Sequence, residues 1–222
     1  CQDCHMPGEK AELANGSPVR TGVPHHGLLG IANDLRARSV AVEVTVKPAP
    51  DRPEWNQVAG IDVHVAVTNT TAAHYIPAGL PERRLAVRAR IVDDKNTDAN
   101  LGFTWHLGRE LADDNKQWAP FWRATQVFRD TRIAPGATWK DSWQSAAPNS
   151  GKVIVEVAYI GLAEEAAALL HVKDVELQML ATLEVPFGAP SGTARAKLPK
   201  TVTHAPKSPG KRAPAKKREN AP

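Results

Sequence analysis

The first five residues, Cys1-Gln2-Asp3-Cys4-His5, have the spacing C-x-x-C-H. This spacing is the attachment signature of c-type haem. The thiols of Cys1 and Cys4 would each form a thioether bond to a haem vinyl group, and the imidazole of His5 would reach the iron as its proximal ligand. The segment therefore predicts covalently bound haem c with its iron.

Two other chemistries use cysteines at this spacing, a redox-active dithiol and half of a zinc site. A dithiol of the thioredoxin type lies at a helix start after a strand, and a zinc site needs further ligands, whereas the sequence holds only two cysteines. Haem is the favoured interpretation, and the dithiol and the metal site stay as alternatives. Because haem attachment normally follows export, we expect Cys1 to lie inside a longer chain.

A haem iron needs a sixth ligand or has an open face. His25 and His26 lie in the loop Pro24-His25-His26-Gly27, roughly twenty residues after the motif, and are candidate distal ligands. They would serve this haem or a neighbouring one. Met6 is a poor candidate, because it is adjacent to His5 and would lie on the proximal side.

Charge is divided unevenly along the 222 residues. Residues 189–222 contain nine Lys or Arg and one acid, which gives +8, so the remaining residues carry −4 of the net +4. A basic tail on an acidic body suggests a tether to an acidic partner, a membrane surface or a cell-wall polymer. The alternative is a disordered, solubilising end. Because the tail has no aromatic residue for base stacking, we expect no specific nucleic-acid binding.

Several stretches alternate apolar and polar residues with a period of two, which is typical of half-buried strands. The clearest strands are predicted at 40–46, 61–67, 85–91 and 153–159, with weaker ones at 121–128 and 137–144. Turn-forming residues separate them. At least six such strands predict a mainly β fold, an antiparallel β-sandwich with one wet face on each sheet.

Two short helices are expected beside the strands. Apolar residues at helical spacing predict one within 27–38, and strong helix formers predict another near 162–171, while 175–185 is ordered but of undetermined type. The expected organisation is a mostly irregular haem-binding segment at 1–38, a β-sandwich domain at 39–188 and a disordered Pro/Lys/Ala-rich basic tail at 189–222. No stretch is long and apolar enough to predict a transmembrane helix.

A second motif lies between the second and third predicted strands and reads Asn-Thr-Thr-Ala-Ala-His-Tyr-Ile-Pro-Ala-Gly-Leu-Pro-Glu-Arg-Arg over 69–84. It resembles the V-T-N-x-x-A-G-H-x-x-P-T-G-x-P-x-R-R segment in the C-terminal domains of some bacterial multihaem c-type cytochromes. In that group a C-x-x-C-H-M-P motif and a His-containing loop precede a β-sandwich. The stretch 130–136 is similar to a D-x-R-I-x-P-G turn of the same domains. Ala73 and Ala78 depart from the pattern, where Gly and Thr are usual.

This second motif adds three candidate site residues. His74 is an alternative axial ligand, or a hydrogen-bond donor to a haem propionate, on a loop made stiff by two prolines. A buried structural histidine is the competing interpretation. Arg83 and Arg84 are possible propionate contacts through bidentate pairing, although only alternate residues of a strand face one side.

The favoured function is electron transfer through the covalent haem, as part of a multihaem cytochrome or redox complex whose partners are other haem domains or cytochrome subunits. Two alternatives remain: a haem-containing oxidoreductase subunit with an open axial position, and a structural β-domain that ends a haem chain. No catalytic constellation is recognisable, so an electron carrier is favoured over an enzyme. The resemblance implies a periplasmic, cell-surface or extracellular location.

Overall fold

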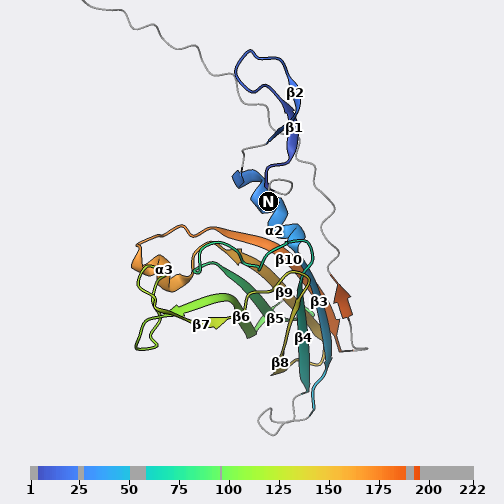
Figure 1. Cartoon of the computed structure of the whole chain (residues 1–222). Helices are drawn as coiled ribbons and strands as arrows, with labels where there is room; N and C mark the ends of the chain where they lie inside the picture. Colours follow the sequence, from blue (N-terminus) through green and yellow to red (C-terminus); the bar gives the residue numbers. More distant parts are fainter. Residues whose placement is uncertain (1–4, 25–27, 51–58, 96, 189–192, 196–222) are drawn as a thin grey trace, which may run out of the picture.

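Two antiparallel β-sheets packed face to face form the body of the protein (Figure 1). The computed structural model describes residues 5–24, 28–50, 59–95, 97–188 and 193–195. A hairpin of β1 (Gly8–Ala11) and β2 (Arg20–Pro24) stands beyond one end of the sandwich, with helix α2 (Leu28–Ser39) between the two. The predicted mainly β, antiparallel fold is confirmed.

The smaller sheet has the strand order β11-β3-β4-β8. Its strands are β3 (Val40–Pro48), β4 (Gly60–Asn69), β8 (Thr138–Ala146) and β11 (Thr193–Arg195). Every second residue of β3 and β4 is a valine or isoleucine with almost no exposed surface. Because successive side chains of a strand point to opposite faces, this alternation places one apolar face of the sheet against the core.

The larger sheet has the strand order β10-β9-β5-β6-β7. Its strands are β5 (Arg84–Asp93), β6 (Asp98–Ala112), β7 (Gln126–Asp130), β9 (Gly151–Ile160) and β10 (Leu177–Phe187). On the inner face of this sheet, Val87 of β5 lies opposite Val157 of β9 and Trp105 of β6. The predicted strands at 85–91 and 153–159 are therefore neighbours in one sheet.

One core fills the space between the sheets. It is built mainly of valines, and Trp105 of the larger sheet meets Trp139 of the smaller one edge to face, with ring centres 5.7 Å apart. Complete burial of one such aliphatic side chain stabilises a fold by about 1.5–3 kcal/mol. The core therefore stabilises the packing of the two sheets. The loops at the ends of the sandwich lie outside this core and can hold a functional site.

Several predicted elements need correction. Residues 121–123 form a turn, and the predicted strand at 121–128 is reduced to β7, whose residues are all exposed at the sheet edge. The fifteen-residue strand β6 has no counterpart among the predicted strands, although Ala99, Leu101, Phe103, Trp105 and Leu107 alternate with polar or glycine residues as a half-buried strand requires. Residues 177–187, of undetermined type from sequence, form β10.

The two ends of the chain also contain more regular structure than predicted. The segment before α2 includes the hairpin of β1 and β2, and β11, within the predicted tail, pairs with β3. Both helices are confirmed, with α2 at Leu28–Ser39 and α3 at Glu164–Leu169. In the part of the chain that the structure describes, no helix is long and apolar enough to cross a membrane.

Candidate haem-ligand site

The loop that joins β4 to β5, residues 70–83, carries His74 and lies at the sandwich end that faces α2. The last residue of β4, Asn69, pairs with Val40, the first residue of β3, and α2 ends one residue earlier. Thr70 continues the contact, since its N–H donates to the Ser39 carbonyl at 2.9 Å. The order of the strands therefore brings the loop and the N-terminal segment to the same place.

A second loop holds the His74 loop from the side. The peptide groups of Ile76 and Ile133 exchange two hydrogen bonds of 3.0 and 2.8 Å, and both side chains are buried. The Arg132 guanidinium lies over the Tyr75 ring, 5.0 Å from its centre. The two segments that resemble multihaem cytochromes thus meet directly, although about sixty residues separate them in the sequence.

An ion pair holds Arg132 in this place. Its Nε and Nη2 donate to the two Asp130 oxygens at 2.8 and 2.7 Å, and Arg109 donates to the same carboxylate at 3.2 Å. These hydrogen bonds lower the pKa of Asp130 to about 2, and those from Arg132 have the largest effect. Asp130 is therefore ionised through the range in which most proteins work.

Asp130 makes stability depend on pH in acid. The pKa of Asp130 is lower in the folded protein than in the unfolded chain, where it is about 3.9. The stability that this difference adds is fully present above about pH 3.9 and is lost as the pH falls toward 2. We expect Asp130→Asn to lower the melting temperature at pH 6 by about 2–4 °C. The difference from wild type should shrink at pH 2.5, as measured by circular dichroism. An equal difference at both pH values would contradict this account.

His74 and His5 face each other across a gap. Their ring centres are 6.3 Å apart and their planes differ by 17°, and both side chains are exposed. His5 belongs to the C-x-x-C-H motif, whereas His74 lies in the loop that follows the last residue of β4. Among the predicted site residues that the structure describes, His5 and His74 lie close together although 69 positions separate them.

The tautomer of His74 suits a metal ligand. Its Nδ1 lies 2.9 Å from the Tyr75 carbonyl oxygen. A carbonyl only accepts hydrogen bonds, so in the neutral imidazole Nδ1 carries the proton and Nε2 has the free lone pair. Metal-ligating histidines commonly donate their other ring N–H to a backbone carbonyl in this way, which fixes the ring orientation.

The spacing of the pair also suits one metal ion between the rings. Metal–imidazole bonds of about 2 Å on both sides, with ring centres about 1 Å further back, place the centres about 6 Å apart. The observed distance of 6.3 Å between the ring centres agrees with this value, and the rings are nearly parallel. His5 and His74 are therefore at the separation that two imidazole ligands of one iron would have.

The two arginines predicted as propionate contacts have different surroundings. Arg83 is half-buried and donates to the Ala78 carbonyl at 2.9 Å. It crosses Gly79, whose φ of +88° favours glycine and where a Cβ would collide with the guanidinium. Arg84 is buried, and its Nη1 donates to the carbonyls of Pro81 and Arg83. A propionate contact by either residue stays a prediction.

Arg83 and Arg84 lie near different charged groups. Arg84 is close to Glu110, Glu165 and Glu82, and burial lowers its pKa. Arg83 is close instead to Tyr159, whose ring is covered by the Arg36 guanidinium of α2 at 3.9 Å. Burial raises the pKa of Tyr159. Only Arg83 thus shares a side of the sandwich with α2.

Four predicted site residues lie outside the described residues: Cys1, Cys4, His25 and His26. Their assignments as thioether and candidate distal ligands stay predictions. One important residue, Asn69, was missed as a site residue, although it opens the second motif. Its side chain is buried and donates to the His74 carbonyl at 2.8 Å. A buried asparagine at a strand end was the signal that could have revealed it.

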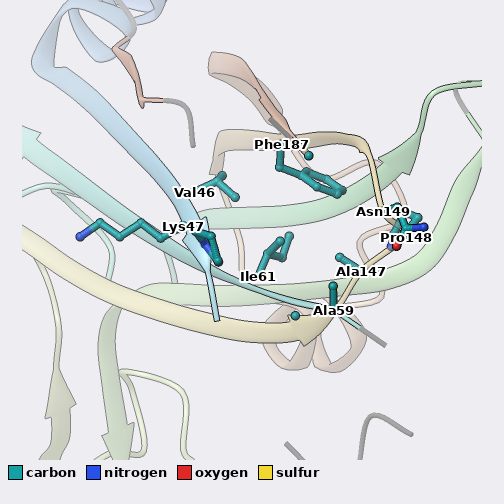
Figure 2. Close-up of a pocket in the computed structure, with 11 residues that line it drawn as sticks. Val46, Lys47, Ala59, Ile61, Ala147, Pro148, Asn149 and Phe187 are labelled. Atoms are coloured by element: carbon teal, nitrogen blue, oxygen red, sulfur yellow. The ribbon is translucent and has the colours of Figure 1, made fainter. Parts of the chain in front are cut away.

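A separate hollow of about 290 Å³ opens between the sheets at the other end of the sandwich (Figure 2). Val46, Ile61 and Phe187 form its apolar wall. Gly60, which also lines it, lies at the opposite end of β4 from Asn69, about 30 Å away at about 3.3 Å per residue. The hollow is therefore distinct from the histidine pair.

The fold and the histidine pair together define a β-sandwich domain with a candidate haem-ligand site at one end. A solved structure with this fold is the penta-heme cytochrome c552 from Thermochromatium tepidum, with a TM-score of 0.61 and 22% identity. The match covers 84% of this chain and 47% of the cytochrome, so the chain spans about half of that protein's length. The similarity to a multihaem cytochrome c is one of fold.

Two other solved structures are more distant. A structural genomics target has a TM-score of 0.34 and 10% identity over 66% of this chain and 84% of its own. A protein described as ApaA from Bordetella pertussis has a TM-score of 0.32 and 16% identity over 73% of this chain and 95% of its own. Both values are too low to support an argument. The chain matches no protein-family model and no curated protein.

Proposed function

We propose that this chain is an electron-transfer module with one covalent haem c, whose axial ligands are His5 and His74. The observation that carries the proposal is the distance of 6.3 Å between two nearly parallel imidazole rings, one of which belongs to a C-x-x-C-H motif. The fold shared with part of a penta-heme cytochrome c552 supports it.

The chain's own residues would hold and orient the haem. The thiols of Cys1 and Cys4 would bond to it covalently, and His5 and His74 would ligate the iron from its two sides. The Tyr75 carbonyl keeps the proton on Nδ1 of His74, which leaves Nε2 as the ligating atom. The bound haem would supply a site that accepts and releases one electron.

Two imidazole ligands favour electron transfer over chemistry on a substrate. They would fill both axial positions of the iron and would leave none for a substrate. The protein then sets the distance, orientation and surroundings of the haem. An oxidoreductase subunit with an open axial position is the alternative if His74 is not a ligand. A structural β-domain at the end of a haem chain is the alternative if this haem is not reduced by a partner.

The setting is also part of the proposal. We expect other haem domains or cytochrome subunits as electron partners, in a multihaem protein or complex located in the periplasm or at the cell surface. The basic tail at 189–222 is proposed as a tether to an acidic partner, a membrane surface or a cell-wall polymer. The charge of +8 on that segment supports this assignment.

Absorption spectra of the haem-loaded chain test the ligand set. We expect a low-spin spectrum in both oxidation states, a pyridine adduct typical of two thioether bonds, and no rapid reaction of the reduced form with carbon monoxide. The physical reason is that His74 fills the position at which carbon monoxide would bind. Rapid binding of carbon monoxide to the reduced wild-type protein would overturn the proposed bis-histidine ligation.

A further inference from the structure

Asn69 occupies a fixed position beneath the His74 loop. It is the last residue of β4 and has no exposed surface. Its backbone N–H donates to the Ala137 carbonyl, and its carbonyl accepts from the Gly136 N–H, both at 3.0 Å. The strand and the neighbouring turn therefore hold the Asn69 backbone on both sides, independently of the His74 loop.

The side chain of Asn69 connects three separate backbone groups. Its Oδ1 accepts from the Ala72 N–H at 3.1 Å, and its Nδ2 donates to the carbonyls of His74 at 2.8 Å and Ile133 at 3.2 Å. The orientation of the amide follows from these partners, because an N–H only donates and a carbonyl only accepts. An aspartate of the same shape would place a carboxylate against two carbonyl oxygens.

This network restricts the backbone on both sides of the His74 imidazole. The His74 carbonyl is held by Asn69, the Tyr75 carbonyl accepts from the ring Nδ1, and Ile76 is bound to Ile133 at both its N–H and its carbonyl. We infer that Asn69 is the positioning residue that aims Nε2 of His74 at the iron before the ligand bond forms. This inference rests on the proposed ligation by His74.

The variant Asn69→Asp removes both donors while it keeps the size of the side chain. Loss of a hydrogen-bond partner of a ligating ring typically lowers metal affinity by about 10- to 100-fold, and because Asn69 bonds the His74 backbone we expect an effect no larger than this. We therefore expect a high-spin fraction in the oxidised protein and carbon monoxide binding by the reduced protein. Added free imidazole should restore the low-spin spectrum, because the change lies at the sixth position of the iron.

Further variants separate positioning from general loss of structure. Thr71→Val is the matched control, because Thr71 lies in the same loop but its hydroxyl donates to the Arg38 carbonyl. It should keep the wild-type spectrum. Asn69→Ser, which keeps a neutral donor, should give an intermediate high-spin fraction and serves if the aspartate variant does not accumulate. In a His74→Ala background, Asn69→Asp should have no further effect on spin state.

The outcomes distinguish this inference from the proposed function. If His74→Ala gives a high-spin haem that binds carbon monoxide, but both Asn69 variants stay low-spin and do not bind it, His74 is the ligand and the positioning inference is wrong. If Thr71→Val opens the iron as much as Asn69→Asp, the effect belongs to the loop as a whole and the inference is also wrong. If His74→Ala leaves the iron low-spin, the proposed ligation itself fails.

Discussion

Replacement of His74 by alanine is expected to convert the haem-loaded protein from low-spin to high-spin. The variant would remove the proposed ligand on one side of the iron and would leave His5, the other proposed ligand, in place. The reduced variant should then bind carbon monoxide rapidly, and free imidazole should restore the low-spin spectrum of the oxidised variant. Absorption spectra of the oxidised and reduced protein, with and without each small molecule, measure this directly.

His64→Ala is the matched control for that experiment. His64 is exposed on the outer face of β4, and its Nε2 lies 3.1 Å from an Asp62 oxygen. Its removal should leave the spectrum unchanged. A His74→Ala variant that stays low-spin would direct attention to His25 and His26, whose single alanine variants would then show which histidine ligates the iron.

The second large effect is expected for Arg84→Gln, on stability. Arg84 is 6% exposed and donates to two carbonyls, and its side chain crosses Gly108, where a Cβ would lie 2.6 Å from the Arg84 Cδ. Hydrogen bonds made by a charged group contribute about 1.5–3 kcal/mol each, so the loss of both should cost about 3–5 kcal/mol. It also leaves the buried carboxylate of Glu82 without the neighbouring charge of Arg84, whereas Glu110 keeps its ion pair with Arg129.

Arg83→Gln is the comparison for that variant. Arg83 is only half-buried and makes one hydrogen bond to a carbonyl, so its loss should cost about 0.5–1.5 kcal/mol. Urea unfolding followed by circular dichroism compares the two variants. Equal losses of stability would contradict the different environments of these adjacent residues. A change of midpoint potential in Arg83→Gln without loss of stability would support its propionate contact.

Local patterns in the sequence predicted most of the fold. The valine strands β3, β4, β5 and β9 follow from period-two alternation, and α2 and α3 follow from helical spacing and helix formers. The prediction failed for β7, whose residues are all exposed at the edge of the larger sheet, so that burial imposes no apolar alternation on them. In β6 the alternation is present over 99–107 and was missed.

The candidate site was only partly predictable for a related reason. C-x-x-C-H identifies His5 by itself, because the chemistry lies within five consecutive residues. The histidine opposite His5 cannot be identified from consecutive residues, and proximity along the chain favoured His25 and His26 for this position. The choice of His74 depends on where β4 ends relative to the N-terminal segment.

By itself the sequence determined the haem motif, the β-sandwich and the basic tail, because each depends on composition or short-range periodicity. The tertiary structure decided that His74 faces His5, that Asn69 supports it, and that Arg83 and Arg84 lie in different environments. The physical reason is that contacts between distant segments, such as the pairing of Thr68 with Thr138 and the hydrogen bond from Asn69 to the Ile133 carbonyl, place these side chains.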